Sequence, residues 1–138
     1  MKKIFCLAFA AMLCCGFVAC SDDDDVNNSN LTSEEKLLVG TWTFEKGYEN
    51  GYGYWYAEED GYEEIVTYKS NGTGVVRVRE YDEDYGWDGP ETINFEWELV
   101  GSKLYAVFYG EESVSRVEKL TERELVLSDE EGRYYYVR

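Results

Sequence analysis

The stretch ETINFEWELVGSKLYAVF, residues 91–108, indicates how this chain folds. Apolar residues alternate with polar ones through both of its halves: Ile93, Phe95, Trp97 and Leu99 in the first, and Leu104, Ala106 and Phe108 in the second. Such alternation is typical of a strand with one buried face. The two residues Gly101 and Ser102 predict a tight hairpin turn, which sets Leu99 opposite Leu104 and Phe95 opposite Phe108.

The same alternation, interrupted by turn residues, runs through the rest of the chain from residue 41 onward. It predicts eight strands in all, at 41–48, 62–69, 73–81, 91–99, 103–109, 113–120, 124–128 and 132–138. The connections are mostly short, which favours an all-β, antiparallel up-and-down meander that closes into a small barrel and so removes its exposed edges. Before the first strand, Thr32 and Glu35 have the spacing of a capping box and predict a short helical turn.

The inward face of this barrel is predicted from the same parity. The expected core residues are Trp42, Phe44, Val76, Val78, Phe95, Trp97, Leu99, Leu104 and Phe108. Pairing Val76 with Trp97 and Val78 with Phe95 puts these side chains on the inner face and Arg77 opposite Glu96 on the outer face. The two faces are distinct because a one-residue shift in register would move every side chain of the strand to the other face. The alternative parity places Arg77 and Arg79 inside, as an anion site. The turn KSNGTG, residues 69–74, leaves the facing of Val66 and Tyr68 open.

The N-terminal residues predict an export signal. Two lysines precede an apolar run from Ile4 to Ala19, which is the layout of a signal peptide over residues 1–19 and is too short for a membrane span. The tetrapeptide FVAC, residues 17–20, resembles the lipobox of bacterial lipoproteins, which implies that Cys20 is lipidated and anchors the protein in a membrane. The alternative is a freely secreted protein.

Residues 20–31 predict a lipidated acidic linker that contains four consecutive aspartates. Ser21 followed by this run resembles the export tag that sends some lipoproteins to the outer face of the outer membrane. The expected location is therefore the outer membrane, with the protein exposed on the cell surface. The alternative interpretation of the run is a plain solvated linker.

The composition narrows the chemistry that the protein can perform. The chain has no histidine, and Cys6, Cys14 and Cys15 would leave with the signal. Catalysis by Ser-His or Cys-His pairs and imidazole metal sites are therefore excluded, and we expect no cofactor, no metal and no enzymatic activity. Removal of Lys2 and Lys3 leaves 11 basic and 29 acidic residues, a net charge of −18. Such a charge argues against nucleic acid as a partner.

One family resemblance rests on three segments. They are LVGTWTF (38–44), YKSNGTG (68–74) and KLTERELVLSDEEGRYYYV (119–137). Gly40 and Trp42 in the first segment resemble the Gly-X-Trp motif of lipocalins, and the three together resemble the lipocalin-like domain of small bacterial lipoproteins. The resemblance implies that residues 32–138 form a lipocalin-like barrel, with Trp42 packed across its closed end, and that the barrel binds a small ligand.

Meander parity predicts where such a ligand would bind. Two long connections fall at the end of the barrel away from the linker, and they carry Tyr52, Tyr54, Trp55, Tyr56, Tyr85 and Trp87. Aromatic loops on a rigid scaffold are common binding surfaces. We therefore expect a non-enzymatic protein that holds a small apolar or glycan ligand there. Alternatively these rings cap the barrel, and the site lies on the outward row Tyr105, Val107 and Tyr109.

The acidic surface supports a second functional hypothesis of a different class. A net charge of −18 suits an interaction or inhibitor module that captures a basic protein partner. Ionic strength separates the two hypotheses, because capture by long-range charge weakens in salt and burial of rings in a pocket does not.

Overall fold

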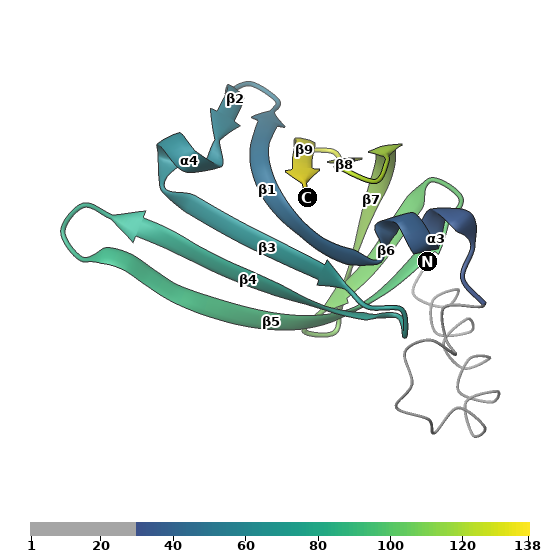
Figure 1. Cartoon of the computed structure of the whole chain (residues 1–138). Helices are drawn as coiled ribbons and strands as arrows, with labels where there is room; N and C mark the ends of the chain where they lie inside the picture. Colours follow the sequence, from purple (N-terminus) through teal and green to yellow (C-terminus); the bar gives the residue numbers. More distant parts are fainter. Residues whose placement is uncertain (1–29) are drawn as a thin grey trace.

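The computed structural model describes residues 30–138, in which the chain forms nine strands and two short helices (Figure 1). The helices are α3 (Ser33–Leu38) and α4 (Ala57–Asp60). The strands are β1 (Gly40–Glu49), β2 (Gly53–Tyr56), β3 (Tyr62–Tyr68), β4 (Thr73–Asp82), β5 (Gly86–Val100), β6 (Lys103–Phe108), β7 (Glu111–Leu120), β8 (Glu124–Ser128) and β9 (Gly132–Val137). The predicted signal peptide 1–19, Cys20 and the predicted linker up to residue 29 lie outside the described residues.

Eight of these strands form one antiparallel meander that closes on itself. Strands β3 to β9 pair in chain order, and β1 pairs with β3 on one edge and with β9 on the other. The contact between the first and last strands makes a closed barrel, so most backbone groups that would form free sheet edges are paired. The predicted all-β barrel is confirmed, and its eight predicted segments correspond to β1 and to β3 through β9.

Helix α3 covers one end of the barrel. The predicted capping box is present: the Thr32 N–H donates to the Glu35 carboxylate at 2.7 Å, and the Glu35 N–H donates to the Thr32 hydroxyl at 3.1 Å. The helix ends at Leu38, which is fully buried. Its carbonyl accepts a hydrogen bond from the indole Nε1 of Trp42 at 2.8 Å, so the first strand is tied to the helix that precedes it.

The core fills the barrel behind this helix. Of the predicted core residues, those that the structure buries are Trp42, Phe44, Val76, Phe95, Trp97 and Leu104, while Val78, Leu99 and Phe108 are partly buried and pack against the core. The indole Nε1 of Trp97 donates to the carbonyls of Lys69 and Thr73, at 3.1 and 2.9 Å, and so fixes the β3–β4 turn. This end of the barrel is therefore packed and closed.

The strand registers agree with the prediction in one hairpin and differ in the next. In the β5–β6 hairpin Leu99 pairs with Leu104, Trp97 with Ala106 and Phe95 with Phe108, as predicted. In the β4–β5 hairpin the prediction is wrong by four residues, because Val76 pairs with Ile93 rather than with Trp97.

The β4–β5 difference follows from the length of the loop. Residues 86–90, expected to belong to a long loop, extend β5, so that only 83–85 connect the two strands. Because side chains alternate with a period of two, a shift of four residues leaves each side chain of β4 on its predicted face. Arg77 is exposed and lies opposite Thr92, not opposite Glu96.

The connection predicted as a loop at 49–61 contains a strand and a helical turn. β1 pairs with β3 only from Gly40 to Thr43, and from Lys46 onward its edge pairs with β2 instead. Figure 1 shows β1 and β3 diverging beyond this point, with β2 and α4 placed above the gap. The divergence brings β2, and Trp55 on it, to the far end of the barrel.

Candidate ligand-binding site

A cavity of about 250 Å³ lies inside the barrel beyond the packed core. Most of the rings and carboxylates that line it project from β1, β2, β3 and β9, and Ser113 and Ser115 complete the wall from β7. Its aromatic residues are Phe44, Trp55, Tyr62, Tyr68, Phe108, Tyr134 and Tyr136. Its carboxylates are Glu64 and Asp129, and no lysine or arginine lines it. The cavity is therefore rich in aromatic rings, and the only charged side chains that line it are carboxylates.

Phe44 is the centre of one wall of this cavity. Its ring centroid lies 4.8 Å from that of Trp55, 5.6 Å from that of Tyr62 and 5.4 Å from that of Tyr136. The Trp55 and Tyr62 rings are themselves 5.5 Å apart, edge to face. Aromatic pairs at such distances stabilise one another and resist displacement. The four rings therefore form a preformed wall.

The position of Trp55 depends on a glycine of the neighbouring strand. Gly47 pairs with Trp55 across β1 and β2, and any side chain at position 47 would overlap the indole ring. The missing side chain leaves the space beside β1 that the indole ring occupies. The indole Nε1 is buried and has no hydrogen-bond partner among residues 30–138.

Glu64 is the polar centre of the cavity. Tyr62 donates its hydroxyl proton to Oε2 at 2.5 Å, and Tyr136 donates to Oε1 at 2.8 Å. The side chain is half-buried, and within residues 30–138 no lysine or arginine nitrogen lies within 4.0 Å of it. The carboxylate is thus held by two neutral donors and by no cation.

The surroundings of Glu64 affect the neighbouring phenols. Burial raises the pKa of Tyr62, Tyr68 and Tyr136 above the ordinary 10.0, and the negative charge of Glu64 raises each pKa further. All three hydroxyls therefore keep their protons at neutral pH, and those of Tyr62 and Tyr136 serve as donors to the Glu64 carboxylate. The cavity is an environment that disfavours additional negative charge.

The six aromatic residues predicted from the loops do not form one surface. Trp55 alone lines the cavity. Tyr52 and Tyr85 project from loop tips and are 89% and 90% exposed. Trp87 stacks against the Arg79 guanidinium, which lies 4.5 Å from its ring centroid.

The remaining two, Tyr54 and Tyr56, lie on the outside of β2. Lys46 Nζ lies 5.7 Å from the ring centroid of Tyr54, 5.9 Å from that of Tyr56 and 5.0 Å from that of Tyr135. Side chains alternate between the two faces of β2, so Trp55 points into the cavity while Tyr54 and Tyr56 point outward. The outer cluster of three tyrosines around Lys46 therefore lies on the opposite face of β2 from the cavity.

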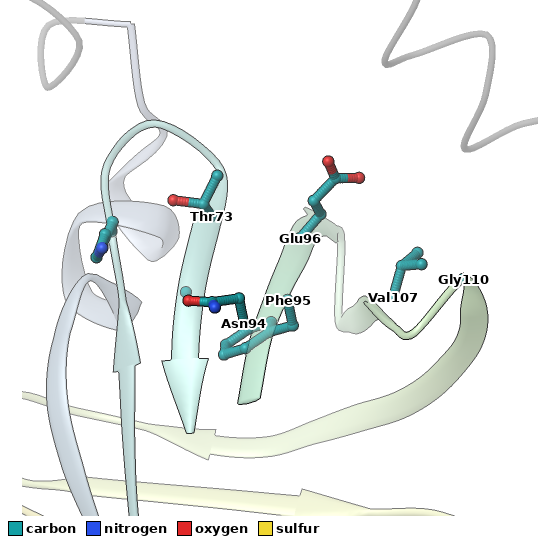
Figure 2. Close-up of a pocket in the computed structure, with 8 residues that line it drawn as sticks. Thr73, Asn94, Phe95, Glu96, Val107 and Gly110 are labelled. Carbon is teal, nitrogen blue, oxygen red and sulfur yellow. The ribbon is translucent and has the colours of Figure 1, made fainter. Parts of the chain in front are cut away.

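The predicted outward row of Tyr105, Val107 and Tyr109 lies on β6 and just after it, and Val107 of this row lines a different hollow. Tyr105 and Val107 are half-buried, and Tyr109 is 77% exposed. A hollow of about 540 Å³ lies beside this row, and Figure 2 shows the side chains of Thr73, Asn94, Glu96 and Val107 around it. No hydrogen bond among residues 30–138 joins these polar side chains to one another, so the hollow lacks the convergent groups that the inner cavity has.

Sequence reasoning missed Glu64, Tyr62 and Tyr136 as site residues. A local signal existed, since Tyr62, Glu64, Val66 and Tyr68 alternate along β3 and place one carboxylate on an otherwise apolar face. That face could not be assigned because the parity of β3 depended on an ambiguous turn.

Within residues 30–138 the structure has no group of three or more acidic or cysteine side chains arranged to hold a metal ion. In the same part of the chain, no helix is both long enough and apolar enough to cross a bilayer.

Comparisons with known proteins agree with this architecture. The family model described as "Lipocalin-like domain" matches residues 38–127. A lipocalin-like protein from Bacteroides uniformis has a similar crystal structure, with a TM-score of 0.57 at 13% identity, covering 74% of this chain and 98% of that one. An uncharacterized protein from Bacteroides eggerthii gives a TM-score of 0.53 at 12% identity, covering 73% and 98%. None of the curated protein sequences matches the chain.

Proposed function

The chain belongs to the lipocalin-like domain family, and from this premise we propose that it is a non-enzymatic binding module that takes one small, largely apolar ligand into its barrel. The observation that carries the proposal is the cavity of about 250 Å³ with its wall of packed aromatic rings. Small-molecule sites are concave, mostly apolar and few per protein, with a few polar groups that fix the orientation of the ligand.

The size of the cavity limits the ligand. Binding pockets commonly measure roughly 300–1,000 Å³, so a volume of about 250 Å³ suits a molecule with a single ring and a short side chain. An oligosaccharide or a long acyl chain would exceed this volume. Of the two ligand classes expected from the sequence, the geometry therefore favours the small apolar ligand over the glycan.

We propose further that the protein acts as a lipoprotein on the outer membrane, exposed at the cell surface and anchored through Cys20. The lipobox-like FVAC and the acidic run after it support this location. Helix α3 opens the described chain and covers the closed end of the barrel. An anchor on the preceding linker would place the closed end toward the membrane and leave the opposite end facing away from it.

The test is a titration of small aromatic and aliphatic molecules, followed by calorimetry. Ser115 lines the cavity, and Ser115→Leu should fill part of it and weaken binding at least tenfold. Thr92→Leu is the matched control, because it adds the same side chain on the exposed face of β5. If Ser115→Leu folds and binds as tightly as Thr92→Leu, the ligand does not occupy the barrel.

A further inference from the structure

The cavity contains a carboxylate without a counter-charge. Both oxygens of Glu64 accept hydrogen bonds from neutral phenols, at 2.5 Å from Tyr62 and 2.8 Å from Tyr136. Neither a lysine nor an arginine lines the cavity. A half-buried charge is expensive unless it is paired or hydrogen-bonded. The two tyrosine hydroxyls supply hydrogen bonds to the carboxylate, but they are neutral and do not balance its negative charge.

We propose that the ligand of this cavity carries a positively charged amine, and that Glu64 is the group that pairs with it. This inference rests on the proposed binding function and adds the charge class of the ligand to it.

The carboxylate has the capacity for a further partner. A carboxylate offers about four acceptor positions on its two oxygens, and the tyrosine hydroxyls use one on each. A hydrogen bond between an ammonium and a carboxylate is charge-assisted and roughly twice as strong as a neutral one. Tyr62 and Tyr136 hold the acceptor in place before the ligand arrives, which lowers the ordering cost of binding.

The aromatic wall attracts the same kind of ligand. Cations bind favourably over the faces of aromatic rings, with tryptophan the strongest, and the attraction grows when water is removed. Phe44, Trp55 and Tyr62 form one contiguous group of rings beside Glu64. An aryl-alkyl amine would therefore find ring contacts for its apolar part and a carboxylate for its nitrogen within a single cavity.

A second carboxylate adds to the selection for positive charge. Asp129 also lines the cavity, and its Oδ1 accepts the backbone N–H groups of Glu131 and Gly132 at 2.8 and 3.0 Å. These bonds fix the turn between β8 and β9. The two carboxylates together oppose the entry of an anionic ligand of the same shape.

The test compares three probes of similar shape: 2-phenylethylamine, 2-phenylethanol and 3-phenylpropanoate. Calorimetry should show the amine binding at least roughly tenfold tighter than the alcohol, and the carboxylate weakest, since the ammonium forms an ion pair with Glu64 that the neutral alcohol cannot form and the carboxylate is repelled by it. Glu64→Gln keeps the shape of the side chain and should abolish the preference for the amine while the alcohol binds as before.

The matched control is Glu96→Gln, which removes the same charge from the outer face of β5. It should leave the amine preference unchanged, so that the effect of Glu64 is separated from the general acidity of the surface. A wild-type measurement needs no variant: the carboxyl carbon signal of Glu64 should shift in NMR spectra during titration with the amine and much less with the alcohol.

The outcomes separate this inference from the function on which it rests. If the alcohol binds and the amine is not preferred, or if the preference survives Glu64→Gln, the charge assignment is wrong and the cavity remains a binding site. If none of the three probes binds to the wild type, both the charge assignment and the proposed cavity function fail for small aryl ligands.

Discussion

Tyr136 and Glu64 are 72 residues apart in the chain and are joined by a hydrogen bond of 2.8 Å from the tyrosine hydroxyl to Oε1. The bond crosses the interior of the barrel from β9 to β3, two strands that flank β1 on opposite sides. It therefore depends on closure of the barrel, and it fixes the carboxylate on which the proposed ligand selectivity depends.

Stability should fall in alkaline solution because of the buried phenols. Burial, and next the charge of Glu64, raise the pKa of Tyr68 and Tyr136 above 10.0. Above about pH 10 the unfolded chain loses these protons while the folded chain keeps them, so the free energy of unfolding decreases with rising pH. Urea unfolding at a series of pH values measures this slope, which should be shallower in Tyr68→Phe. A slope in Tyr68→Phe equal to that of the wild type would contradict this assignment.

Arg138 should stabilise the closed end of the barrel. Its guanidinium lies 4.1 Å from the ring centroid of Trp42 and donates to the carbonyls of Leu37, Val39 and Glu122. We expect Arg138→Ala to lower the free energy of unfolding by about 1–3 kcal/mol, because it removes a cation–π contact and three hydrogen bonds.

Arg138→Lys should recover little of this loss, since an ammonium cannot reproduce the planar fork of donors. Arg116→Ala, on an exposed side chain of β7, is the control and should change stability by less than about 0.5 kcal/mol. Equal stabilities of the Arg138 and Arg116 variants in urea would show that the guanidinium contacts contribute nothing.

Trp97 should be among the most costly positions to truncate. The side chain is 5% exposed and its indole N–H donates to two carbonyls of the β3–β4 turn. Trp97→Ala should lower the free energy of unfolding by about 3–5 kcal/mol, because it leaves a new cavity and removes two hydrogen bonds that hold the turn. A loss below about 1 kcal/mol in denaturant titration would place Trp97 outside the core.

Membrane attachment should depend on Cys20. If FVAC is a lipobox, Cys20→Ser removes the acylation site and the protein should move from the membrane fraction to the soluble fraction. Folded Cys20→Ser protein that still sediments with membranes would rule out the lipid anchor.

Surface exposure should depend on the acidic run after Cys20. Replacement of Asp22 to Asp25 with alanine should keep the lipid and reduce protease accessibility on whole cells.

Most of the strands can be predicted from the sequence, because local alternation of apolar and polar residues and the turn residues between them determine where each strand lies. The β5–β6 register follows from a two-residue turn and an unbroken alternation, and both are readable between residues 91 and 108. The predicted β4–β5 register is wrong because Gly89 and Pro90 are typical of a loop, whereas the strand begins at Gly86 and includes both. Parity survived that error because the shift was even, and the inward face of β4 was therefore correct.

The site was harder to predict than the fold because it is made by contacts between distant segments. The sequence predicts Trp55 as an exposed loop residue, whereas its inward direction follows from β2, a four-residue strand that begins at Gly53 and pairs with β1. Glu64 acquires its role from Tyr136, which only barrel closure brings near it. No periodicity within a single strand contains that information.

The most direct test of the account is a crystal structure of the protein with bound 2-phenylethylamine. The account predicts that the phenyl ring lies in the cavity against Phe44 and Trp55, with the amine nitrogen within hydrogen-bond distance of Glu64. An amine bound instead among the outer tyrosines around Lys46, or in the hollow beside Val107, with the cavity unoccupied, would contradict it.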